Sequence, residues 1–192
     1  MTMLNTADST PRTRGIAYGA AALTVLGGLV IAGCRHDATP VAESSTAQVA
    51  LARIDSRGLA EAVARCRGKV VLVEFWATWC APCVKLFPHT VELHRRLADQ
   101  GLAVISVSMD DTESQEAVLR FLCGRQAAFE NFISQYGLGS EGFDAFDIHD
   151  GALPHLDLYD RNGHLRKTFA SGSQPLEPGQ IDRAVADLLK SL

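Results

Sequence analysis

The sequence predicts an α/β domain built on a mixed four-stranded central sheet with helices on both faces. Residues 70–75 are almost continuously apolar, which is typical of a strand buried on both faces of a sheet. Residues 102–109 form a second apolar strand after a helical stretch, and this strand–helix–strand order gives a right-handed parallel unit. The turn sequence at 160–163 joins two further strands as an antiparallel pair. These three patterns place parallel and antiparallel strands in one sheet.

The remaining elements follow from capping residues and periodicity. Asp55 or Ser56 caps a first helix, which Gly68 ends, and Gly101 ends the helix between the first two strands. The region after the second strand is long, and we interpret it as an insertion between the second and third core strands. The expected order is strand 69–76, a helix to about residue 100, strand 102–109, helical pieces 113–122 and 126–136, loop 137–151, strands 156–159 and 164–170, and helix 178–189.

The N-terminal third differs from the rest of the chain. Residues 1–33 combine a short segment carrying arginines with an apolar stretch, which is typical of an export signal. The stretch ends in Ile-Ala-Gly followed by Cys34, which resembles a bacterial lipoprotein processing site. An uncleaved membrane anchor is the alternative, although the apolar stretch is slightly short for a membrane span. Either interpretation predicts that residues 34–51 are a lipidated or anchored linker and that residues 52–192 form an extracytoplasmic domain, on the periplasmic side of a bacterial membrane.

Two cysteines lie three positions apart where the first strand gives way to a helix. The sequence Trp76-Ala77-Thr78-Trp79-Cys80-Ala81-Pro82-Cys83 places Cys80 in the first helical turn and Cys83 on the same helical face. The free N–H groups and partial positive charge of a helix start favour a thiolate there. Pro82 is compatible with this turn because the missing N–H is not needed. The alternatives are a structural disulfide or half of a zinc site, but the sequence has no second ligand pair at the spacing that zinc sites use.

This motif, following an apolar strand, resembles the thioredoxin-fold thiol–disulfide oxidoreductases, most closely the membrane-tethered TlpA/ResA-like branch. The resemblance covers roughly residues 52–192 and implies a thioredoxin fold. We expect Cys80, at the exposed end of the motif, to attack a client disulfide and Cys83 to resolve the mixed disulfide. The chemistry needs no cofactor and no metal.

Glu74 and Pro154 are further catalytic candidates. Glu74 is a charged residue inside the buried strand, and the family has an acidic residue at this place, beneath the resolving cysteine. A buried carboxyl has a raised pKa and can exchange protons near neutrality, so Glu74 is expected to relay protons for Cys83; an outward-facing glutamate is the alternative. The resemblance also implies a cis-proline at Pro154 that faces the cysteines and leaves backbone groups free for an extended substrate, whereas an ordinary trans-proline is the alternative. Leu153 stands where many relatives have a small or β-branched residue.

The substrate-binding residues are expected around the motif. Trp79 is predicted to shield Cys80 and to offer an apolar contact surface, whereas Trp76 is expected to pack in the core. Ala81, Pro82 and Leu153 complete this predicted surface. The Ala-Pro pair between the cysteines lacks the histidine found in strongly oxidising relatives. We therefore expect the protein to reduce disulfide bonds in exported client proteins, of which apocytochrome c is one candidate.

Other features bear on partners and alternatives. Cys66 and Cys123 could form a structural disulfide or remain buried thiols. A copper-binding metallochaperone using Cys80, Cys83 and a histidine such as His149 or His155 is a rival function, and a docking module with an idle cysteine pair is another. The formal charge of −4 without a basic tract argues against nucleic acid as a partner. We expect the protein to be a monomer whose cysteine pair is reduced again by an electron donor on the membrane side.

Overall fold

The computed structural model describes residues 49–137, 139–171 and 175–191, and the expected signal sequence and Cys34 lie outside this range. The helices and strands are β1 Ala52–Ile54, α1 Ser56–Arg65, β2 Val70–Trp76, α2 Ala81–Leu97, β3 Leu102–Ser108, α3 Gln115–Arg125, β4 Glu130–Ser134, α4 Ser140–Ala145, β5 His155–Tyr159, β6 Leu165–Ala170 and α5 Pro178–Lys190, with short 3-10 turns at Ala98–Gln100 and Thr112–Ser114.

One mixed sheet forms the centre of the described domain. Its strands are arranged in the order β1-β4-β3-β2-β5-β6. Strand β1 pairs in parallel with β4, β4 with β3, and β3 with β2. Strand β5 pairs antiparallel with β2, and β6 pairs antiparallel with β5. The predicted four strands are therefore present in the predicted directions, but the described sheet has six strands rather than four. The additional strands, β1 and β4, widen the parallel side.

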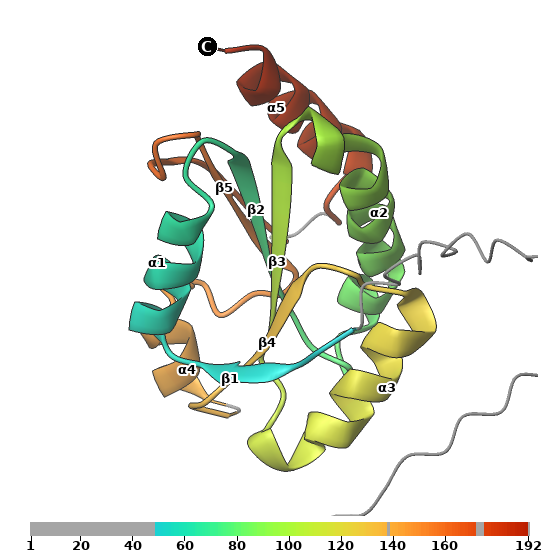
Figure 1. Cartoon of the computed structure of the whole chain (residues 1–192). Helices are drawn as coiled ribbons and strands as arrows, with labels where there is room; N and C mark the ends of the chain where they lie inside the picture. Colours follow the sequence, from blue (N-terminus) through green and yellow to red (C-terminus); the bar gives the residue numbers. More distant parts are fainter. Residues whose placement is uncertain (1–48, 138, 172–174, 192) are drawn as a thin grey trace, which may run out of the picture. The chain divides into compact units, whose positions relative to one another are not determined.

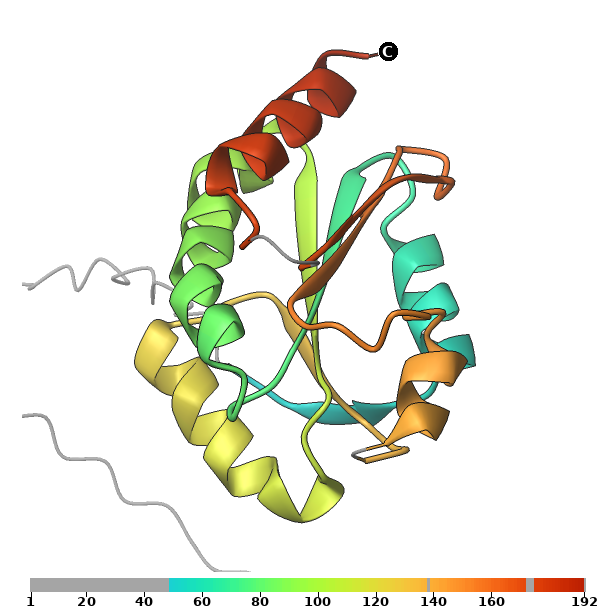
Figure 2. The same ribbon diagram turned by 180° about the vertical axis from the view of Figure 1, so that it is seen from behind.

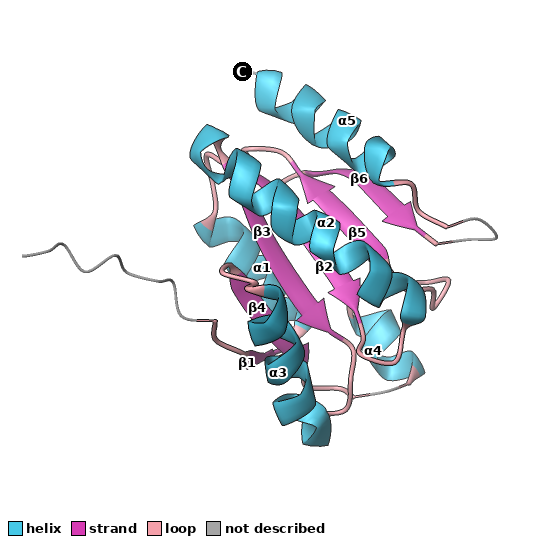
Figure 3. Ribbon diagram, turned by 90° about the vertical axis from the view of Figure 1, so that its right-hand side faces the viewer, coloured by secondary structure: helices cyan, strands magenta, loops and turns pink. Residues whose placement is uncertain are grey.

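Helices cover both faces of this sheet. Figures 1 and 2 show α1 and α4 on one face and α2, α3 and α5 on the other, and Figure 3 shows α2 lying across the strands. Alternate residues of β2 serve the two layers: Val71, Val73 and Phe75 pack toward α1, whereas Val70 and Leu72 pack toward α2 and α5. All seven residues of β2 are buried, as the apolar run predicted.

The structure also settles which residue caps the first helix. Asp55, rather than Ser56, is the N-cap of α1, and its carboxylate accepts a hydrogen bond from the Gly58 N–H at 2.7 Å. Gly68 and Gly101 both adopt positive φ angles where the chain leaves a helical segment, as their positions predicted.

The prediction of a helix at residues 126–136 was wrong, because this segment contains the strand β4. Helix α3 ends at Gln126, which adopts the left-handed conformation with φ of 55°. The following strand carries the polar Asn131 at a buried position, which masked the strand pattern in the sequence. Asn131 is satisfied there, since its amide donates to the Ala127 and Phe129 carbonyls and accepts from the Ser106 hydroxyl on β3. Tertiary pairing with β3 thus outweighs local propensity.

The linker expected at residues 34–51 enters the described structure at its last residues. Val49 and Leu51 pack against a buried cluster that includes Trp76, Cys83 and Phe87. The chain is therefore anchored on the domain just before β1 begins.

Candidate active site

The two motif cysteines meet at the start of α2, where they form a disulfide. Cys80 is the N-cap of this helix and Cys83 lies in its first turn, with their α-carbons 5.3 Å apart. The backbone N–H of Cys83 donates to the Cys80 sulfur at 3.3 Å. The outer cysteine therefore lies at the positive end of the helix dipole, and the expected geometry of the pair is present.

The two sulfurs differ in how far solvent reaches their residues. Cys80 retains 6% of its surface and Cys83 retains none, so the order of accessibility is the predicted one, although Cys80 is far less exposed than expected. Trp79 is 55% exposed, and Ala81 and Pro82 are exposed as well. These three exposed residues are the neighbours of Cys80 along the chain. Trp76 is fully buried, as expected of a core residue.

The loop that carries Cys80 is tied to the end of β3. The Met109 N–H donates to the Trp76 carbonyl at 2.7 Å. One residue further on, the Asp110 carboxylate accepts both the backbone N–H of Thr78, at 2.9 Å, and the Thr78 hydroxyl. The strand-to-helix loop is thus held by the neighbouring strand before it reaches the cysteines. Asp110 was not among the predicted site residues, and its only sequence signal is its place just beyond the end of a buried parallel strand.

Glu74 is buried in the middle of the sheet. It is fully inaccessible and pairs in register with Ser106 on β3 and Leu156 on β5. Alternation along β2 places it on the same face as Trp76, which packs with Cys83 and Phe87 of α2. Burial raises the pKa of Glu74 to about 8. Neither carboxyl oxygen has a hydrogen-bond partner among the described residues. The alternative of an outward-facing, solvated glutamate is therefore wrong.

Pro154 and Leu153 lie immediately before β5. The Leu153–Pro154 peptide bond is cis, as the resemblance implied. Leu153 is partly buried and packs against the cluster that contains Cys80, Cys83 and Trp76. The two residues thus adjoin the redox pair.

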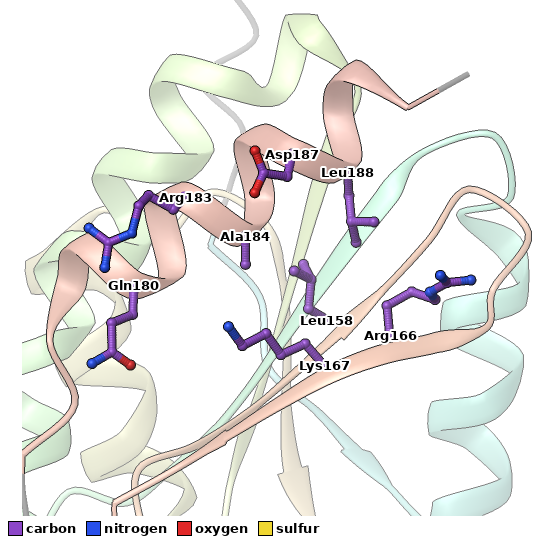
Figure 4. Close-up of a pocket in the computed structure, with 8 residues that line it drawn as sticks. All are labelled: Leu158, Arg166, Lys167, Gln180, Arg183, Ala184, Asp187 and Leu188. Atoms are coloured by element: carbon purple, nitrogen blue, oxygen red, sulfur yellow. The ribbon is translucent and has the colours of Figure 1, made fainter.

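A cleft of about 190 Å³ lies beside the motif. Pro82, Lys85 and Leu86 line it from α2, Pro154 and Ser171 from the strand ends, and residues 175–178 from the start of α5. A second cleft, between β6 and α5, contains none of the predicted site residues (Figure 4). Its walls carry Arg166, Lys167 and Arg183.

The structure also places the other two described cysteines and the two histidines considered for copper binding. Cys66 and Cys123 are free thiols rather than a structural disulfide. Cys66 is half-buried, which raises its pKa, whereas Cys123 is exposed, so the alternative of a buried thiol is wrong for Cys123. His155 faces the α1 side, where its ring contacts Phe75 with centroids 5.8 Å apart, and His149 is exposed. Among the described residues no group of three or more His, Cys, Asp or Glu side chains is arranged to hold a metal ion.

Comparison with solved structures places this architecture. A thiol:disulfide interchange protein of the thioredoxin family from Chlorobium tepidum TLS superposes with a TM-score of 0.52 at 25% identity, over 66% of this chain and 83% of that one. A secreted disulfide oxidoreductase from Mycobacterium tuberculosis gives a TM-score of 0.53 at 16% identity, over 65% and 86% of the two chains, which supports the fold alone. The domain has a thioredoxin fold.

The sequence comparison decides the family. Residues 48–168, more than half of the chain, match the pattern of the AhpC/TSA family. The chain belongs to the AhpC/TSA family.

Several curated relatives of this AhpC/TSA protein share one name. Thiol-disulfide oxidoreductase ResA from Bacillus thuringiensis (strain Al Hakam) is 30% identical over 107 residues, which cover 52% of this chain and 53% of the relative. The ResA protein from Geobacillus thermodenitrificans is 28% identical over 153 residues, covering 76% and 79% of the two chains. The chain thus spans about half the length of the Bacillus relatives that it matches. Within the described part of the chain, no helix has the length and apolar character needed to cross a membrane.

The buried Glu74 makes a specific prediction for stability. Its folded pKa of about 8 lies above the unfolded value, so the folded protein holds a proton that the unfolded chain releases. The wild type should lose stability as the pH rises from about 5 to about 8, by roughly 4 kcal/mol at about 1.4 kcal/mol per pH unit. Glu74→Gln should lack this loss. Urea denaturation of both oxidised proteins across this pH range would measure it, and parallel pH profiles would contradict the burial of an ionisable group.

Proposed function

We propose that this AhpC/TSA protein is a thiol–disulfide oxidoreductase that reduces disulfide bonds in exported client proteins through Cys80 and Cys83. The observation that carries the proposal is the pair itself: a disulfide at the start of α2 in which only the outer cysteine retains exposed surface. The names of the curated relatives support the same reaction class.

The reaction requires a reduced pair and two exchange steps. The Cys80 thiolate attacks one sulfur of the client disulfide, and the other client sulfur leaves as a thiolate. The Cys83 thiolate then attacks Cys80, which releases the second client sulfur and forms the Cys80–Cys83 disulfide. An electron donor on the membrane side returns two electrons to the pair. In the reduced protein, the Cys83 N–H that contacts the Cys80 sulfur at 3.3 Å would stabilise its thiolate.

Glu74 would accept the proton that the Cys83 thiol releases. Cys83 must lose its proton before it can attack, yet it is fully buried. Glu74 lies under the same helix with a pKa of about 8, so its carboxylate can accept a proton near neutral pH. Because Glu74 has no direct hydrogen bond, the proposal includes a bridging water between the two groups.

The client would bind on the surface around Cys80. Trp79 offers an exposed ring beside the pair, and Ala81 and Pro82 continue this surface along the first turn of α2. Leu153 and Pro154 border it from the strand side, and the cleft of about 190 Å³ lies next to Pro82 and Pro154. An extended client segment could lie across these residues with its disulfide over Cys80.

The proposed direction of electron transfer and the proposed location of the protein rest on the sequence. The Ala-Pro pair between the cysteines carries no basic side chain, which favours a reductant whose potential lies well below the about −120 mV of the strongest oxidant of this fold. We propose that a lipid on Cys34 tethers the domain to the outside of a bacterial membrane and that the domain acts as a monomer. Apocytochrome c is one exported client that fits this place.

Single cysteine substitutions test the assignment of roles. Cys83→Ser should accumulate mixed disulfides with clients, because Cys80 can attack but nothing resolves the adduct. Cys80→Ser should accumulate none. Non-reducing gels followed by mass spectrometry of the adducts would measure this, and the reverse pattern would exchange the two roles.

The proton relay predicts a change in the pH profile of exchange. The rate of client reduction should rise with an apparent pKa near 8 in the wild type. Glu74→Gln should lower the rate about tenfold or more at neutral pH and remove that inflection. Stopped-flow measurement of mixed-disulfide resolution is the direct assay. An unchanged profile would remove Glu74 from the mechanism.

The tether makes a chemical prediction. The protein purified from membranes should begin at Cys34 and release fatty acids on acid hydrolysis. Cys34→Ser should lack the fatty acids and leave the membrane fraction. A mature chain that starts elsewhere, or one without fatty acid, would end the lipoprotein assignment.

A further inference from the structure

A buried carboxylate binds the loop between β2 and α2 that leads to Cys80, and it has no role in the mechanism described so far. Asp110 lies two residues beyond the end of β3 and is only 2% exposed. Three donors reach its carboxylate: the Thr78 N–H, the Thr78 hydroxyl and, at 2.6 Å, the Ser108 hydroxyl. Burying a carboxylate is costly unless such donors compensate it, so the arrangement is specific rather than incidental.

These bonds fix the segment that carries the attacking cysteine. Thr78 precedes Cys80 by two residues, and its N–H and hydroxyl bind the two different oxygens of one carboxylate. A two-point contact sets orientation as well as position. The Ser108 hydroxyl donates to the same oxygen that accepts the Thr78 N–H, and the Asp110 N–H donates back to the Ser108 hydroxyl at 3.1 Å. Cys83 lies within α2, whereas Cys80 is the N-cap: its carbonyl accepts the Val84 N–H of the helix at 3.0 Å, and its own N–H donates at 3.2 Å to Ala77 of the loop that Asp110 holds.

We propose that Asp110 is a positioning residue for the redox pair: by holding Thr78 it keeps Cys80 in place against Cys83 and thereby sets the balance between disulfide and dithiol. The inference rests on the proposed function. It concerns the stability of the disulfide, which can be measured without any client.

Two effects of removing this carboxylate act in the same direction. A loosened loop lowers the effective concentration of the Cys80 thiol at Cys83, which weakens the disulfide. Loss of a negative charge near Cys80 also favours its thiolate, which stabilises the reduced form. Both effects shift the equilibrium toward the dithiol.

Asp110→Asn is the decisive substitution. The amide removes the negative charge and replaces one acceptor oxygen with N–H groups. Either the Thr78 N–H loses its acceptor or a hydroxyl of Thr78 or Ser108 must turn to accept, and every remaining bond loses its charge assistance. Equilibration with a glutathione redox buffer should show the pair about tenfold easier to reduce, which corresponds to about 30 mV for two electrons. Thr78→Val removes only the hydroxyl bond and keeps the backbone bond to Asp110; it should shift the equilibrium about threefold in the same direction.

Asp157→Asn is the matched control. Asp157 is also buried, at 7% exposure, and accepts a hydrogen bond from the Thr168 hydroxyl at 2.7 Å. It lies on β5 beside His155, which packs with Phe75 on the α1 face rather than with the cysteines. Its substitution should lower the unfolding midpoint of the protein yet leave the glutathione equilibrium within about twofold of the wild type.

The outcomes separate the possible roles. If Asp110→Asn lowers stability like Asp157→Asn but leaves the equilibrium within twofold, Asp110 is purely structural and the inference is wrong. If Asp110→Asn does not fold, the Thr78→Val equilibrium decides, and no shift there overturns the inference. A wild type that reduces no client would refute the proposed function, whereas the shift in the variants would still be measurable.

Discussion

The burial of β2 on both faces is the constraint on which the rest of the structure depends. This strand lies between parallel β3 and antiparallel β5, and all seven of its residues are inaccessible. A slip of one residue in its register would move Glu74 to the α1 face and Val73 to the α2 face. The two apolar layers therefore fix where the carboxyl group lies, and they also fix where the strand ends and the cysteine motif begins.

The reactive part of the molecule is irregular backbone held by this regular frame. The segment between Trp76 and Cys80 is tied to β3 through the Met109 N–H and the Asp110 carboxylate. The first turn of α2 then holds Cys83 beneath Phe87 and Trp76, whose rings lie 4.7 Å apart. Reactive loops on rigid scaffolds are the usual arrangement in enzymes. Here the two ends of the loop belong to the most deeply buried strand and to the helix that packs on it.

Local patterns were sufficient for the parts of the fold that repeat a simple rule. Continuous apolar runs identified β2 and β3, and the family resemblance supplied the fold and the cis-proline. The strands β1 and β4 escaped detection for physical reasons: β1 is only three residues long, and β4 carries a buried asparagine whose partners come from distant segments. Asp110 was missed for the same reason, because its two bonds from Thr78 form only when the end of β3 and the motif loop lie side by side. The exposure of Cys80 was overestimated because sequence position does not reveal how closely neighbouring chains cover a sulfur.

The contrast between a nearly covered Cys80 and a widely exposed Trp79 has a consequence for selectivity. A sulfur that offers so little surface can be approached only along a narrow range of directions. A disulfide recessed inside a compact domain could not reach it, whereas one carried on a protruding, pliable strand could settle against the indole first. Under the proposed function, the limited access to Cys80 would favour disulfides on flexible polypeptides over those inside compact domains, whatever the amino-acid sequence.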